Sequence, residues 1–428
     1  MAVETTTGAA APLPAADAAP AAKQGFWAWL NKRMPVDDFI ASQLTGYYAS
    51  KNLNFWYFFG SLSVLVLVVQ LLSGMYLTMF YKSGELTSFD SVQYIMREVD
   101  YGWLIRYLHS TGASAFFIVV YLHMFRALLY GSYRAPRELL WLIGMLVYLA
   151  LMAEAFLGYV LPWGNMSFWA AQVIVNLFST VPLVGPALVI WISGDYGIAD
   201  ATLNRFFALH VAVVPLALLL LVMLHLVALH QVGSNNPDGV EINDRRREDG
   251  KPLDGIPFHP YYTVKDMVGV GVFFVLFAIV LFFAPTLGGL FLETTNFEPA
   301  NPLSTPEHIT PAWYFTPFYA ILRAVPSKGM GALLLLLSVA AYLFLPWLDR
   351  SPVKSMRYKG WMSRTALALF TVSFVVLAYL GMQPAEGLYV VLARIFAFIY
   401  FLYFIAMPFY TYFEKVNPVP ERVTYHAH

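Results

Sequence analysis

Four of the nine histidines in this sequence fall inside long apolar stretches. His109 and His123 are fourteen residues apart in one stretch, and His210 and His225 are fifteen apart in another. Fourteen residues make nearly four turns of an α-helix, so His109 and His123 lie on almost one face, about 21 Å apart along the axis. Ionisable groups are costly inside a membrane span, so such a cluster indicates a functional site.

The two histidine-bearing stretches are the second and fourth apolar stretches of the chain, so they cross a membrane in the same direction. His109 then shares a depth with His210, and His123 shares one with His225. A single histidine of this kind is more often a hydrogen-bonded interior residue. Zinc would require further Cys or carboxylate ligands at the same level, and the chain has no cysteine. Haem iron takes two axial ligands from opposite sides, so the pairs favour two bis-histidine haems.

Glycines repeat the histidine spacing in the first and third apolar stretches, as the pairs Gly60 with Gly74 and Gly144 with Gly158. A glycine pair in a membrane helix ordinarily marks close helix packing. Two pairs at the spacing of the ligands predict flat slots for the haems. Arg106 and Arg126, near the ends of the second stretch, are predicted charge partners for the haem propionates.

The composition predicts an all-α, polytopic membrane protein. Of 428 residues, 59% are hydrophobic and only 12% are charged, and the mean hydropathy is +0.60. About 20 apolar residues suffice to cross a bilayer. Eight such runs are present, and the first four should form a bundle that holds the two haems. The runs lie near 55–80, 104–131, 138–160, 203–230, 267–285, 329–348, 365–381 and 390–412.

Three long connections lie on one side of the predicted membrane, at 81–103, 161–202 and 286–328. Such loops commonly carry function. The second should contain short helices, and the third, rich in Pro and aromatic residues, should be ordered. The opposite side collects most of the Lys and Arg, including "DRRRED" at 244–249. The positive-inside tendency therefore predicts that both termini are cytoplasmic.

The chain divides at the basic stretch between the fourth and fifth spans. Without cysteine it can hold no thiolate-ligated cluster and no covalently attached haem. The predicted parts are a disordered N-terminal tail and lead-in (1–34), a di-haem four-helix domain (35–240), a C-terminal domain of four helices with the third long loop (241–415), and a C-terminal tail (416–428).

Several stretches resemble the cytochrome b family, the core subunits of ubiquinol:cytochrome c oxidoreductase (cytochrome bc complex, respiratory complex III), in their bacterial full-length eight-helix form. The resemblance runs from about residue 35 to 415. Besides the paired His and Gly, it is carried by "RYLHSTGAS" (106–114), "FLGYVLPWGNMSFW" (156–169), "TLNRFFALH" (202–210), "HQVGSNNPDG" (230–239), "VKDMVG" (264–269) and "TPAWYFTPFYAILRAVP" (310–326).

The resemblance implies a Q cycle coupled to proton translocation in the bacterial inner membrane. Ubiquinol is oxidised at an outer site, and quinone is reduced at an inner site after electrons pass through two non-covalent b-type haems. The implied partners are a Rieske iron-sulfur protein, a membrane-anchored c-type cytochrome subunit, quinone, lipids and a second copy of the complex in a homodimer. Nothing suggests nucleic acid as a partner.

The resemblance also assigns residues. His109 and His210 would ligate the low-potential haem on the outer side, and His123 and His225 the high-potential haem near the cytoplasm. The outer quinol site would comprise Phe156, Tyr159, Gly164, Trp313, Tyr314 and Tyr319. The inner quinone site would comprise His230, Ser234, Lys265 and Asp266.

Elementary chemistry independently favours two of the inner residues. His230 at a helix end could pass a proton to a quinone carbonyl, and Asp266, predicted to open the fifth helix, could do the same.

Two departures from the family pattern lead to further expectations. The fifteen-residue step from His210 to His225 is one longer than in the commoner full-length form, which predicts a bulge or kink near Pro215. The third long loop reads "PAWY", where the family usually has Pro-Glu-Trp-Tyr, so Ala312 replaces a proposed proton acceptor. Glu154, one turn before Gly158, is the predicted substitute.

Two other functions stay open at this point. The chain could be a di-haem membrane anchor of another quinone-linked reductase, which would not need the long third loop. It could also be a proton transporter with histidine relays, which would not explain the glycine spacing.

Overall fold

The computed structural model describes residues 25–41 and 46–425. Within these ranges, eight helices are long and apolar enough to cross a membrane, which confirms the predicted number. Each falls on a predicted apolar run, and the ends differ by up to four residues except at the fifth span, which begins nine residues earlier than predicted. The spans are Phe55–Thr78, Gly102–Tyr130, Glu138–Val160, Asp200–Val232, Phe258–Phe283, Lys328–Leu348, Trp361–Gly381 and Gly387–Phe413.

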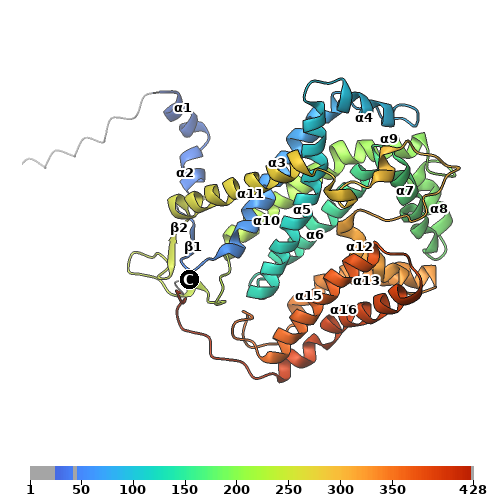
Figure 1. Ribbon diagram of the computed structural model, residues 1–428. Helices are drawn as coiled ribbons and strands as arrows, with labels where there is room; N and C mark the ends of the chain where they lie inside the picture. Colours follow the sequence, from blue (N-terminus) through green and yellow to red (C-terminus); the bar gives the residue numbers. More distant parts are fainter. Residues whose placement is uncertain (1–24, 42–45, 426–428) are drawn as a thin grey trace, which may run out of the picture.

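The first four spans pack as two neighbouring pairs (Figure 1). Helix α3 (Phe58–Thr78) packs along α5 (Gly102–Tyr130), and α6 (Glu138–Val160) packs along α10 (Val214–Val232). Each glycine-bearing helix therefore lies beside a histidine-bearing helix. This arrangement brings small residues to the level of the imidazoles.

The fourth span contains the predicted irregularity. Between α9 (Asp200–Ala208) and α10, residues Leu209–Val213 form a π-helical turn that includes His210. A π-turn holds one more residue than an α-turn, so it accommodates the fifteen-residue step. The turn precedes Pro215, the predicted position. In the interior of a regular helix, a proline would clash with the carbonyl group four residues earlier. Pro215 avoids this position, because it lies at the start of the regular segment α10.

The remaining spans pack outside these two pairs. Helix α11 (Thr263–Phe283) packs against α3 and α5, and Asp266 lies in its first turn, as predicted. Helices α15 (Trp361–Gly381) and α16 (Gly387–Phe413) pack along each other. The short helix α12 (Thr316–Arg323) packs against both of them and against α13 (Lys328–Ala340).

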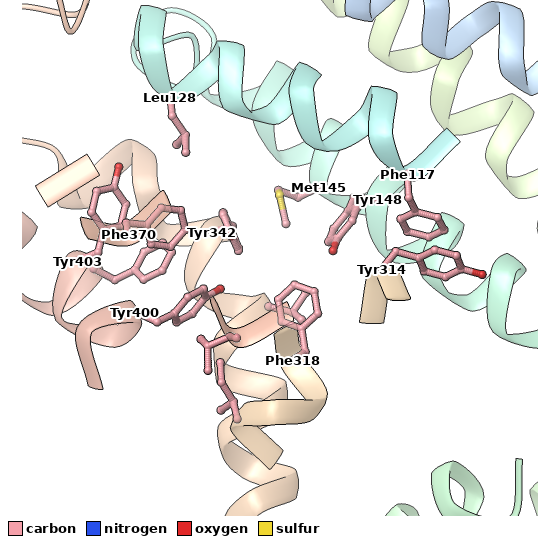
Figure 2. Packing of buried hydrophobic residues seen from close by; sticks show 14 of the residues in the cluster. Phe117, Leu128, Met145, Tyr148, Tyr314, Phe318, Tyr342, Phe370, Tyr400 and Tyr403 are labelled. Carbon is pink, nitrogen blue, oxygen red and sulfur yellow. The ribbon is translucent and has the colours of Figure 1, made fainter. Parts of the chain in front are cut away.

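One large hydrophobic cluster joins the two halves of the chain. Figure 2 shows aromatic side chains from both halves side by side. The Phe117 ring of α5 stacks on Tyr314, with ring centres 3.9 Å apart and planes at 4°. Tyr148 of α6 belongs to the same cluster as Phe318 and Tyr342. The shared core fixes the third long loop against the first bundle, while the predicted division near residue 240 stays a prediction.

The long connections are ordered, as expected. Segment 161–202 contains α7 (Asn165–Leu177) and α8 (Gly185–Ser193), and 81–103 contains α4 (Ser88–Arg97). The third connection contains a short 3₁₀ helix at Thr294–Phe297 and ends in α12. Figure 1 shows α4, α7 and α8 at one end of the bundle.

The opposite end holds a two-stranded antiparallel sheet, in which β1 (Tyr48–Ser50) pairs with β2 (Gly255–Pro257). Asp254, just before β2, accepts hydrogen bonds from Lys51 at 2.7 Å and from Arg422 at 2.8 Å. Helices α1 (Phe26–Arg33) and α2 (Val36–Ile40) precede the first span. Residues 1–24 of the predicted tail lie outside the described residues.

Asp254 predicts an acid-sensitive attachment of the C-terminal segment. Burial alone would raise the pKa of Asp254, but hydrogen bonds from Arg422 and Lys51 lower it to about 2. A depressed pKa contributes stability above the unfolded value of about 4, and this contribution is lost as the pH falls towards 2. Asp254→Asn is expected to speed trypsin cleavage after Arg422 at pH 7, measured by mass spectrometry of the purified protein. Asp249→Asn, which alters an exposed ion pair with Lys251, is the control, and equal cleavage of the two variants would contradict the attachment.

Candidate functional site

The first histidine pair lies at the end of the bundle that carries the three long connections. His109 of α5 and His210 of the π-turn face each other with ring centres 6.2 Å apart and planes at 87°. Nδ1 of His109 lies 2.9 Å from the Ser73 hydroxyl. Nδ1 of His210 lies 3.0 Å from both the backbone carbonyl oxygen and the Oε1 of Glu154. With Nδ1 engaged, Nε2 of each ring is left to bind a metal.

The second pair repeats this geometry at the other end of the bundle. His123 of α5 and His225 of α10 have ring centres 6.4 Å apart and planes at 70°. In both pairs the separation leaves room for one metal ion bonded to each ring at about 2 Å. The structure thus brings the four histidines together in the two predicted pairs.

The four glycines lie directly against the imidazoles, each facing a different ring. A Cβ atom would approach the imidazole Cε1 closely at Gly60 (3.3 Å from His123), Gly74 (3.2 Å from His109), Gly144 (3.0 Å from His225) and Gly158 (against His210). Any side chain here would enter the space beside a ligand ring. Two imidazoles on opposite sides and a cleared slot between flanking helices fit a planar, bis-histidine-ligated group.

A cavity of about 400 Å³ runs from the first histidine pair to the third long loop. Haem-slot residues and predicted quinol-site residues line it together, and they include His109, His210, Arg106, Glu154, Tyr159 and Tyr314. Ala312, which is 4% exposed, also lines this cavity. At the other end of α5, Arg126 donates to the Asn235 carbonyl at 3.2 Å and lies over the Tyr130 ring.

Tyr159 and Tyr314 line this cavity, and Trp313 lies next to Tyr314 in the chain. The Tyr159 hydroxyl donates to Oε2 of Glu293 at 2.9 Å. The Trp313 indole donates to the Ser114 hydroxyl at 3.1 Å, and Tyr314 stacks on Phe117 as described. The aromatic residues predicted for the outer site are therefore fixed by both packing and hydrogen bonds.

Two other predicted outer-site residues have different neighbours. The Tyr319 hydroxyl donates to the Ile309 carbonyl at 3.0 Å, and the ring lies under the Arg323 guanidinium. Phe156 packs edge-on against Phe206, with ring centres 5.8 Å apart. Neither of these two residues is among those that line the cavity.

Gly164 marks the place where the third long loop crosses the start of α7. A Cβ at Gly164 would collide with Asn296. Backbone hydrogen bonds fasten the two segments on either side, from Asn165 N to Glu298 O at 2.9 Å and from Ala300 N to Trp163 O at 3.0 Å. The loop is thereby held against the turn that follows α6.

The inner-site residues lie near the second histidine pair. The His230 ring stacks on Tyr47, with centres 4.5 Å apart and planes at 16°. The Tyr47 hydroxyl donates to the Ser234 hydroxyl at 3.2 Å. This contact brings two of the predicted inner-site residues onto one tyrosine.

Asp266 and Lys265 approach from the first turn of α11. Oδ1 of Asp266 accepts a hydrogen bond from Ser61 at 2.9 Å, and Ser61 follows Gly60, which lies against His123. Lys265 Nζ lies 5.3 Å from the centre of the Tyr262 ring. Asp266 thus contacts the residue that follows the glycine lying against His123.

Sequence reasoning missed Tyr47 and Glu293. Tyr47 lies in "TGYYAS" ahead of the first span, and Glu293 is the single charged residue in "LGGLFLETTNF". An isolated carboxylate in an apolar run of a loop was the signal available for Glu293. The predicted Glu154 does line the cavity with Tyr159, but its carboxylate contacts the His210 ring.

Comparison with known proteins gives the same picture over nearly the whole chain. Residues 44–233 match the family model described as cytochrome b/b6/petB, and residues 299–401 match cytochrome b (C-terminal)/b6/petD. The cytochrome b of Allochromatium vinosum is 60% identical, covering 92% of this chain and 97% of the relative. The cytochrome b of Rickettsia bellii is 50% identical, covering 92% and 96%.

A solved structure, titled hyperthermophilic respiratory complex III, contains a chain with the same fold. It aligns with a TM-score of 0.84 at 37% identity, over 90% of this chain and 98% of that one. On sequence, fold and the arrangement of its paired histidines and glycines, this chain belongs to the cytochrome b family.

Proposed function

We propose how this chain, the core electron-transfer subunit of a quinol:cytochrome c oxidoreductase, holds its cofactors and substrates. His109 with His210, and His123 with His225, each ligate one b-type haem. The observation that carries this assignment is that both imidazole pairs face each other across slots lined by glycine. Bound haem supplies a one-electron carrier at each end of the bundle.

The protein's part is to orient the ligands and clear the slots. Ser73 and Glu154 engage Nδ1 of His109 and His210, which fixes the tautomer and leaves Nε2 for iron. Arg106, which lines the outer cavity, and Arg126, at the inner end of α5, are placed to pair with propionates. The first pair would hold the low-potential haem and the second the high-potential haem.

Two quinone sites complete the proposal. Ubiquinol binds in the outer cavity beside Tyr159, Tyr314 and Ala312, where the Tyr159 hydroxyl accepts a hydrogen bond from the substrate. Quinone binds at the inner end between His230 and Asp266, and these two residues supply its protons. The stacking of His230 on Tyr47 and the hydrogen bond from Ser61 to Asp266 hold both groups in fixed orientations.

Partners supply the chemistry for which this chain has no ligands. Since the sequence contains no cysteine, the iron-sulfur cluster and the covalent haem belong to a Rieske protein and a membrane-anchored c-type cytochrome. The complex works as a homodimer among lipids of the bacterial inner membrane. The basic loops support a cytoplasmic position for both termini, with the Tyr159 end facing outward.

Paired ligation predicts which variants lose the same haem. His123→Leu and His225→Leu are each expected to remove the inner haem and leave the outer one, because each variant takes away one of the two axial ligands of the same slot. Redox-resolved absorption spectra of isolated membranes provide the measurement. His308→Leu, in an exposed part of the third long loop, should keep both haems. Loss of different haems from the two ligand variants would refute the pairing.

The π-turn predicts a second result. Deleting Ala212 converts Leu209–Val213 into a regular turn and keeps His210 and His225 on the same face, so both haems should stay. Deleting Ile118 from the regular helix between His109 and His123 rotates one ligand by about 100°. That variant should lose at least one haem. The measurement is haem content per polypeptide, and equal losses in the two deletions would show that the π-turn does not absorb the extra residue.

A further inference from the structure

The outer cavity lacks a titratable side chain where the family usually has one. Ala312 lines the cavity, is 4% exposed and cannot accept a proton. Quinol oxidation releases two protons, and their removal requires acceptors within hydrogen-bond reach of the substrate or of a group bonded to it. Another residue of the cavity wall must therefore provide the proton acceptor that Ala312 cannot be.

Glu293 reaches this cavity through Tyr159. Its Oε2 accepts the hydrogen bond from the Tyr159 hydroxyl at 2.9 Å, and Tyr159 itself lines the cavity. Glu293 lies in the loop between Leu292, a residue that lines the cavity, and Thr294, a residue that is exposed.

The loop that carries Glu293 is fixed in place. Besides the backbone bonds at Asn165 and Ala300, the amide of Ser167 donates to the Asn296 side chain at 2.9 Å. Asn296 also lines the cavity. Because three bonds hold the next seven residues of the loop against the start of α7, the contact between Tyr159 and Glu293 is a built feature of the site.

The protonation equilibrium of Glu293 suits a proton acceptor. Burial raises the pKa of Glu293 to about 7, against the lowering effect of the hydrogen bond from Tyr159. The titratable groups that face it are the phenols of Tyr159 and Tyr314. The other titratable groups of the cavity are Arg106, Glu154, His109 and His210. An acceptor works best when its pKa lies near the working pH.

Glu154 is the other carboxyl group of the cavity, and its surroundings differ. Its Oε1 and its backbone carbonyl both lie 3.0 Å from Nδ1 of His210. That contact engages the carboxylate with a proposed haem ligand. The proton-accepting role predicted for Glu154 stays a prediction, and Glu293 is the carboxylate bonded to the outer-site tyrosine.

We propose that Glu293 is the terminal proton acceptor of the outer quinol site and that Tyr159 relays the proton to it. This rests on the proposed outer quinol site. A quinol hydroxyl gives its proton to the Tyr159 oxygen while the Tyr159 proton moves to Oε2 of Glu293. One quinol O–H bond breaks and one carboxyl O–H bond forms, leaving a quinol anion, a neutral tyrosine and a neutral carboxylic acid. No electron moves in this step.

The test measures outer-site quinol oxidation in membranes that contain the complete complex, as a function of pH. In the wild type the rate should rise as the pH increases through about 7, because Glu293 must be deprotonated to accept. Glu293→Gln should slow oxidation by roughly 10- to 100-fold and abolish this rise, with both haems present. Adding Ala312→Glu to Glu293→Gln should restore part of the rate.

Two further variants separate the role of Glu293 from loop structure. Glu307→Gln alters an exposed carboxylate of the same loop and should keep the wild-type rate and profile. Tyr159→Phe removes the relay oxygen and should also abolish the rise. If the Glu293→Gln complex assembles with less haem, Tyr159→Phe provides the test of the relay.

The outcomes distinguish the two proposals. A wild-type rate and pH profile in Glu293→Gln would overturn the relay and leave the proposed function intact. The same result in Tyr159→Phe, used if the first variant assembles poorly, would overturn the relay and the substrate hydrogen bond proposed for Tyr159, and leave the haem assignment intact. Loss of the pH-dependent rise in Glu154→Gln alone would also overturn it, in favour of Glu154. Wild-type membranes without quinol oxidation or without two b haems would instead refute the proposed function.

Discussion

The structure depends on the cost of placing four imidazoles inside apolar helices. A polar ring in such surroundings is stabilised by a partner for its nitrogens, and neighbouring helices supply one for each ring of the outer pair. His109 and His210 have Nδ1 partners on neighbouring helices, and each of the four rings lies over a glycine. The pairing of α3 with α5 and of α6 with α10 follows from this, since a larger residue at any of these glycines would push a ligand ring aside.

Features that repeat with a regular period along the chain could be predicted from the sequence alone. Apolar runs of about 20 residues defined all eight spans, and the spacing of His109, His123, Gly60 and Gly74 defined which helix faces meet. The one-residue excess between His210 and His225 predicted an irregular helix, and the π-turn confirmed it. Helical periodicity is a local property, so these inferences did not require knowledge of the loops.

Features that depend on how the third long loop folds back were not predictable in this way. Glu293 is bonded to Tyr159, 134 residues earlier in the chain, and Tyr47 stacks on a histidine of the fourth span. No local pattern links such residues. Conversely, Phe156 and Tyr319 were assigned to the outer site by family resemblance, but their rings lie against Phe206 and Arg323. Resemblance identifies the neighbourhood of a site more reliably than the orientation of each side chain.

The main-chain bonds that join the third long loop to the start of α7 have a consequence for engineering. Glu298 and Ala300 use only their backbone atoms in these bonds, so the path of the loop does not depend on which side chains these positions carry. Acidic, neutral or basic residues can then be exchanged at these positions while the backbone of the loop keeps its path. The driving force and the route of proton release become adjustable without a change of fold. A small library confined to this loop would tune turnover against pH without rebuilding the membrane-embedded bundle.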